Sequence, residues 1–127
     1  MSKFEAINTD TAPQAIGPYS QAIKLDKLLF LSGQIPLDPQ TMEIVPGGLA
    51  EQAHQVFKNL CAVISAAEAI SDNTVKLTIF MTDLNDFPVV NEVMAGYFDE
   101  PYPARATIEV SGLPKGALVE VDAIVAL

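Results

Sequence analysis

An apolar stripe at helical spacing runs through residues 49–70 and constrains the fold more than any other feature of the sequence. Seven apolar side chains recur there every three or four residues: Leu49, Ala53, Val56, Phe57, Leu60, Ile64 and Ala67. This period places them on one face of an α-helix. A helix with one long apolar face needs a second layer to cover it, and the rest of the chain must supply that layer.

Segments with the period of two that is typical of β-strands supply the partner layer. We predict strands over residues 3–8, 19–25, 28–32, 74–82, 104–110 and 118–126, with a tight turn at Asp26 and Lys27. The segment from Ser32 to Pro36 breaks the pattern and ends the third strand. One apolar strand face carries Val75, Leu77, Ile79 and Met81, and another carries Val119, Val121, Ala123 and Val125.

A second helix is predicted over residues 86–99, with Asp86 as its cap and Pro88 in its first turn. Its buried side would carry Val90, Val93, Met94 and Tyr97. Six strands and two helices in this order predict an α+β domain spanning residues 1–127, with both helices on one face of a mixed sheet. The other sheet face has no element left to cover it, although it carries Phe80, Leu118 and Ile124, and this favours self-association.

The formal charge of −9 argues against two classes of partner. Nucleic-acid binding depends on clustered lysine and arginine, and no basic run is present. An anionic membrane surface is disfavoured for the same reason. The start of the chain lacks the apolar run of a signal peptide, and no apolar stretch is long enough to cross a bilayer, so we expect a cytoplasmic protein.

Cys61 and His54 are the only residues of their types. One cysteine and one histidine are too few for a structural zinc site, and no cofactor motif is present. Cys61 borders the apolar stripe and is interpreted as a core thiol, while His54 lies off the stripe and is interpreted as a surface residue. Asn91, one turn after Phe87, is by itself also typical of a helix surface.

Arg105 is the side chain with the clearest chemical potential. It shares the polar face of its predicted strand with Thr107 and Glu109, directly after the rigid Pro103. A guanidinium is planar and always charged, so it suits two-point binding of a carboxylate or phosphate. Most arginines at strand edges form structural salt bridges, however, and the residues alone favour that role.

Glu120 is the natural chemical partner of Arg105, but the two are predicted to lie apart. If the last two strands form a hairpin, Arg105 is offset from Glu120 by four residues, or about 13 Å at about 3.3 Å per residue. One chain could not then place both on a small substrate. Arg105 of one chain and Glu120 of another could meet at an interface.

Four motifs in order strongly resemble the Rid (YjgF) superfamily, and more closely its RidA branch of enamine/imine deaminases. They cover residues 16–22, 31–36, 82–91 and 102–105. The likeness continues through Leu113-Pro114-Lys115-Gly116 and the ending at residues 119–124. It spans nearly the whole chain, which makes the set of motifs specific.

The resemblance implies a chorismate-mutase-like fold and a homotrimer with a central barrel and three sites at subunit interfaces. It implies that Arg105 holds the substrate carboxylate and that Glu120 orients or activates water. The pocket would be lined by Tyr19, Ser32, Gly33, Phe87, Asn91 and Thr107. Thr107 stands where many relatives carry a cysteine, so its backbone N–H would be the donor. With the family in view, the interpretation of Arg105 changes from structural to catalytic.

The implied reaction is the hydrolysis of 2-imino acids, formed from 2-aminoacrylate or its methyl homologue, to 2-keto acids and ammonia. It needs no metal or organic cofactor. The alternative is a non-catalytic trimeric sensor that binds small carboxylates in the same pocket. A ribonuclease role is disfavoured by the charge and by the lack of a histidine pair.

Overall fold

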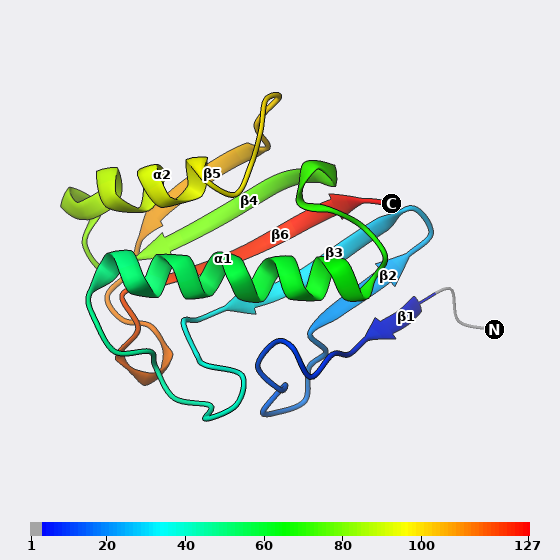
Figure 1. Ribbon diagram of the computed structural model, residues 1–127, viewed down its shortest axis with the longest axis horizontal. Coiled ribbons are helices and arrows are strands. Elements are labelled where there is room, and N and C mark those ends of the chain that lie inside the picture. The colour runs from blue at the N-terminus through cyan, green and yellow to red at the C-terminus, as the bar shows by residue number, and fades with distance from the viewer. Residues whose placement is uncertain (1–3) are drawn as a thin grey trace.

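The computed structural model describes residues 4–127, and Lys3, which the sequence assigns to the first strand, lies outside them. The chain forms six strands and two α-helices in the predicted order (Figure 1). These are β1 (Phe4–Ile7), β2 (Ala22–Leu25), β3 (Leu28–Gln34), α1 (Leu49–Ala66), β4 (Thr74–Met81), α2 (Phe87–Ala95), β5 (Ala104–Glu109) and β6 (Val119–Ala126). Short 3₁₀ turns occupy Ser71–Asn73, Leu84–Asp86 and Pro114–Gly116.

The six strands form one mixed sheet in the order β1-β2-β3-β6-β4-β5. All neighbouring pairs are antiparallel except β4 and β5, which are parallel. Both helices lie on the same face of this sheet, as Figure 1 shows. The α+β architecture predicted from the sequence is therefore confirmed.

The core lies between α1 and the middle of the sheet. The central part of the predicted stripe is fully buried, including Val56, Phe57 and Leu60, and it packs with the alternating face of β6. Two buried amides of α1 fix flanking loops: Gln52 accepts a hydrogen bond from the backbone of Leu118 at 2.8 Å, and Asn59 donates to the carbonyl of Leu37 at 3.0 Å. The helix thus positions the segments that enter β6 and leave β3.

Both helices end earlier than predicted. The helix α1 stops at Ala66, because Glu68 adopts a positive φ of 63° that no α-helix accommodates. The helix α2 stops at Ala95, before Gly96. Asp86 does precede α2, but its side chain makes no capping bond; Asp83 instead accepts one from the N–H of Asn85 at 2.9 Å.

Two strand details differ from the prediction because of β-bulges. A bulge between Thr74 and Lys76 turns Val75 outward, where it is 46% exposed, and buries Thr74. In β3 the pairing register shifts between Leu31 and Gln34, so the strand continues through Ser32 and Gly33 to Gln34. The predicted end of that strand at Ser32 was wrong, because a bulge changes the periodicity without ending the strand.

The hairpin assumed between β5 and β6 does not form, because β4 lies between these strands. The strand β6 buries a complete apolar face and takes a central position, whereas β5 pairs only with β4 and forms an edge. The side chains of Arg105 and Thr107 lie on the helix-covered face, beside Leu77 and Ile79 of β4. The apolar side chains of β5 therefore lie on the other, uncovered face.

The uncovered sheet face carries apolar side chains from four strands, among them Phe30, Phe80, Ile108 and Ile124, and Leu118 directly precedes β6 on the same face by alternation with Glu120. Of these, Phe30 is 39%, Ile108 43% and Leu118 38% exposed. Within residues 4–127 no helix covers this face. Among the same residues, no helix is both long and apolar enough to span a bilayer.

Candidate functional site

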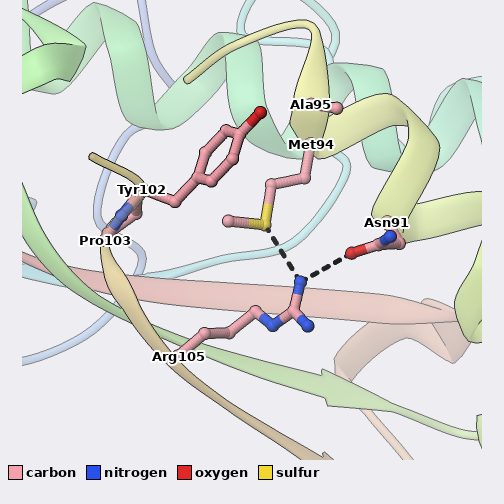
Figure 2. Close-up of a pocket in the computed structure, with 6 residues that line it drawn as sticks. All are labelled: Asn91, Met94, Ala95, Tyr102, Pro103 and Arg105. Carbon is pink, nitrogen blue, oxygen red and sulfur yellow. Dashed lines mark hydrogen bonds between the residues drawn. The ribbon is translucent and has the colours of Figure 1, made fainter. Parts of the chain in front are cut away.

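Arg105 projects from the edge strand β5 toward α2, where three side chains contact its guanidinium; Figure 2 draws two of them, Asn91 and Met94. Its Nη1 donates to Oδ1 of Asn91 at 2.7 Å and to the sulfur of Met94 at 3.6 Å. The ring of Phe87 lies against the guanidinium, 4.7 Å from Cζ to the ring centroid. Phe87, Asn91 and Met94 are spaced by four and three residues, so one stripe of α2 makes all three contacts.

None of these contacts neutralises the charge of Arg105. The amide, the thioether and the aromatic ring are all uncharged, and Arg105 makes no ion pair within residues 4–127. It is also the only arginine in the sequence. A cation held by neutral groups keeps its full attraction for an anion. The salt-bridged role that the isolated strand favours is therefore not the one observed.

An open cavity of about 430 Å³ adjoins this arginine. It is lined by Asn91, Met94, Ala95, Tyr102, Pro103 and Arg105, which Figure 2 shows around one space. The arginine, the asparagine and the hydroxyl of Tyr102 supply polar groups, and Met94, Ala95 and Pro103 supply apolar surface. The cavity combines a single positive charge with neutral polar and apolar groups, which suits a small organic anion.

Glu120 lies in a second cavity of about 320 Å³ that also contains Tyr19 and Gly33. Its carboxylate passes directly over Gly33: a Cβ added there would come within 2.6 Å of Oε2. Tyr19 is 50% exposed, and its hydroxyl accepts a hydrogen bond from the N–H of Ile16 at 3.4 Å. Glycine at position 33 therefore leaves the space that the carboxylate occupies.

The pKa of Glu120 is raised above the ordinary value for glutamate. Partial burial is the main cause, and the negative charge of Asp122, two residues along the same strand face, adds to it. A carboxyl group with a raised pKa exchanges protons closer to neutral pH. This property suits a group that takes and returns protons.

Two further predicted residues lie near these cavities without lining either of them. Thr107 is two residues after Arg105 on the same face of β5. The N–H of Val110 bonds to the carbonyl of Met81, so by alternation the N–H of Thr107 points to the free edge of the sheet. The hydroxyl of Ser32 donates to the carbonyl of Ser20. The hydroxyl of Ser32 therefore bonds to the backbone of the protein itself.

The predicted residues thus fall into two groups that the single chain does not bring together. Phe87, Asn91 and Arg105 form one group, and Tyr19, Gly33 and Glu120 form the other. In the sheet register, Glu120 of β6 pairs with Phe80 of β4, and Phe80 pairs with Ile108 of β5. Ile108 lies three residues beyond Arg105. That register separates their backbones by about 14 Å, at about 3.3 Å per residue and 4.8 Å per strand. The two side chains also lie on opposite faces of the sheet.

Cys61 and His54 lie away from both groups. Cys61 is partly buried on α1, and burial raises the pKa of its thiol, which disfavours the reactive thiolate. His54 is exposed, and its Nδ1 lies 3.2 Å from the hydroxyl of Tyr97. Residues 4–127 contain no group of three potential metal ligands.

Comparison with known proteins identifies the family. The model of the family described as Endoribonuclease L-PSP matches residues 9–127. This chain belongs to that family, which is the Rid (YjgF) family. The resemblance noted from the motifs is therefore confirmed.

The relatives of this Rid chain cover nearly its full length. A Myxococcus xanthus protein named DfrA is 56% identical, covering 94% of this chain and 93% of its own. A mouse protein named 2-iminobutanoate/2-iminopropanoate deaminase is 47% identical, covering 94% of this chain and 89% of its own. The solved structure of RidA from an Antarctic Psychrobacter species is similar to this chain with a TM-score of 0.93 and 46% identity, covering 97% of this chain and 99% of its own.

Sequence reasoning missed part of the arginine site. Met94 was assigned only to the helix core and Pro103 only to the rigid start of the strand, while Ala95 and Tyr102 were given no place in the pocket. The signal for Met94 was available, because it lies seven residues after Phe87 and three after Asn91 on the same helical stripe. Tyr102 and Pro103 directly precede the arginine strand, but no periodic pattern places a loop residue in a cavity.

Proposed function

We propose that this Rid chain hydrolyses 2-imino and 2-enamino acids, such as 2-iminopropanoate and 2-iminobutanoate, to 2-keto acids and ammonia. The observation that carries the proposal is Arg105, a cation held at a sheet edge by uncharged partners only. Such a group binds the carboxylate that every 2-imino acid carries. The name of the mouse relative supports the choice of reaction.

The complete site is proposed to form between subunits of a homotrimer. The two residue groups lie on opposite faces of one chain, so a neighbouring chain must bring Glu120 to Arg105. The uncovered apolar sheet face offers the surface for that association. Head-to-tail contacts that close into a ring give three equivalent sites, each with Arg105 from one chain and Glu120 from the next.

The chemistry requires water to add to the C=N carbon and ammonia to leave. Arg105 binds the carboxylate and fixes that carbon in place. Glu120 takes a proton from the attacking water and gives it to the imine nitrogen, which forms a carbinolamine. It then moves the hydroxyl proton of that intermediate to the amine, so that the C–N bond breaks, ammonia leaves and the keto group forms. The N–H of Thr107 at the sheet edge is a further donor for the bound carboxylate, while Phe87 and Asn91 keep the guanidinium in place. Chain residues alone carry each of these steps.

The test generates 2-aminoacrylate in situ with a pyridoxal-phosphate lyase and measures the rate of 2-keto acid release with and without this protein. The protein should accelerate release, and Arg105→Lys should lose most of the acceleration, since an ammonium cannot reproduce a planar two-point contact. Glu120→Gln should still bind 2-oxobutanoate but hydrolyse poorly. A wild-type protein that binds 2-oxobutanoate and accelerates nothing would be the carboxylate sensor instead of the enzyme.

A further inference from the structure

We propose that Met94 is a positioning residue for Arg105, and that the substrate carboxylate binds the Nε–Nη2 edge of the guanidinium. This inference rests on the proposed carboxylate site and specifies its geometry. It adds a residue and an orientation that the motifs of the sequence do not provide.

The edge that is free to bind a carboxylate depends on which guanidinium nitrogens already donate hydrogen bonds. Nη1 has two N–H bonds, and it has two acceptors, Asn91 Oδ1 at 2.7 Å and Met94 Sδ at 3.6 Å. Nε and Nη2 donate to no acceptor within residues 4–127. Figure 2 shows Nη1 directed toward Asn91 and Met94, and the other two nitrogens directed away from them. Of the edges that can bind a carboxylate at two points, only Nε–Nη2 is free.

Met94 is well placed to hold Nη1 in this orientation. Its side chain is only 5% exposed, and it belongs to the hydrophobic core cluster, so packing fixes the sulfur. Asn91, by contrast, is exposed on the same helix. A single bond from Asn91 would leave the guanidinium free to pivot about Nη1. A second acceptor from a buried side chain, with the ring of Phe87 against the guanidinium, removes that freedom.

The thioether also preserves the charge of the site. A sulfur is a weak, neutral acceptor, so it orients the N–H without competing with an anion for the cation. A carboxylate at position 94 would form an ion pair with Arg105 and block the binding of a substrate. The residue type therefore matches a role in orientation.

Nuclear magnetic resonance of the wild-type protein tests the edge directly. Because Arg105 is the only arginine, the protein has one arginine Nε–H signal, and it needs no assignment by mutation. Titration with 2-oxobutanoate should shift this Hε signal downfield, since a new charge-assisted hydrogen bond forms there. Binding that leaves the Hε signal in place would mean that the carboxylate uses Nη1 and Nη2, and would overturn the proposal.

Substitution of Met94 tests the positioning role. Met94→Leu keeps the volume and removes the acceptor, so the Kd for 2-oxobutanoate and the KM for the imine should rise about threefold to tenfold, with kcat within about twofold. Met94→Gln returns an acceptor of similar length and should restore both constants to within about twofold of the wild type. Met81→Leu, a buried methionine of β4 without a bond to Arg105, is the matched control and should change neither.

The outcomes separate this proposal from the proposed function. A folded Met94→Leu variant with wild-type Kd and KM would refute the positioning role. So would an equal loss in Met94→Gln, because that pattern indicates packing alone. A wild-type protein that binds 2-oxobutanoate through Nε–H but hydrolyses no imine would refute the deaminase and leave the binding geometry supported.

Discussion

The substitution Gly33→Ala provides a sharp test of the role of Glu120, because the displacement that it forces on the Glu120 carboxylate can be worked out from the structure. A Cβ at this position would lie 2.6 Å from Oε2, 3.0 Å from Cδ and 3.3 Å from Cγ of Glu120. Ordinary contact begins near 3.4 Å, so in Gly33→Ala the carboxylate must move by about 0.8 Å. The backbone at Gly33 has no positive φ, so alanine introduces no backbone strain there.

The expected effect of Gly33→Ala is on turnover. A displacement of about 1 Å in a catalytic group costs up to about a hundredfold in rate, so kcat should fall by about tenfold to a hundredfold. The free energy of unfolding should change by less than about 1 kcal/mol, because the end of a glutamate side chain can move. Binding of 2-oxobutanoate should weaken by less than about threefold, since Arg105 is untouched.

The assay measures 2-keto acid release at saturating imine, thermal unfolding and 2-oxobutanoate affinity for each variant. Gly112→Ala is the matched control, because a Cβ there meets no atom within 4 Å. It should leave all three quantities unchanged. A folded Gly33→Ala variant with wild-type kcat would refute the assignment of Glu120 to the proton transfers.

Three further predictions concern charge, the thiol and assembly. The negative charge of Asp122 helps to raise the pKa of Glu120, so Asp122→Asn should lower that pKa and move the acidic limb of the pH–rate profile to lower pH; a limb that stays in place would show that another group titrates. Cys61→Ala should keep kcat and lose about 1 kcal/mol of unfolding free energy, as chemical denaturation would measure; a large loss of turnover in a folded protein would assign the thiol a chemical role. Multi-angle light scattering at micromolar concentration should give the mass of a trimer, and a stable monomer would remove the shared site.

The sequence predicts most of the fold because side-chain periodicity reports burial. The stripe of α1 and the alternation of β6 are strong patterns, and both helices lie on the predicted face of the sheet. The errors occur where one residue changes the period, as at Val75 and Ser32, where β-bulges alter the register without altering composition. Helix ends were missed for a similar reason, since the positive φ at Glu68 has no signature in the residue type.

Strand pairing and the site were less accessible to sequence reasoning. A hairpin between β5 and β6, which follow each other in the chain, was assumed, whereas the insertion of β4 between them depends on how three strands bury their faces together. The motifs pointed to Arg105 and Glu120, and the structure adds that they lie on opposite faces. Helical spacing places Met94 on one stripe with Phe87 and Asn91, but the contact of that stripe with Arg105 depends on the rotation of α2 against β5, which spacing alone does not set.

Subunit complementation is the sharpest test of the shared site, because Arg105 and Glu120 of each site are proposed to lie on different chains. Arg105→Ala and Glu120→Gln chains, each inactive alone, are mixed under conditions of subunit exchange, and mass spectrometry confirms mixed trimers. With equal amounts and random exchange, about one quarter of the sites combine an intact Arg105 with an intact Glu120, so the mixture should show about one quarter of wild-type activity. Confirmed mixed trimers with no activity above that of the separate variants would contradict the shared site.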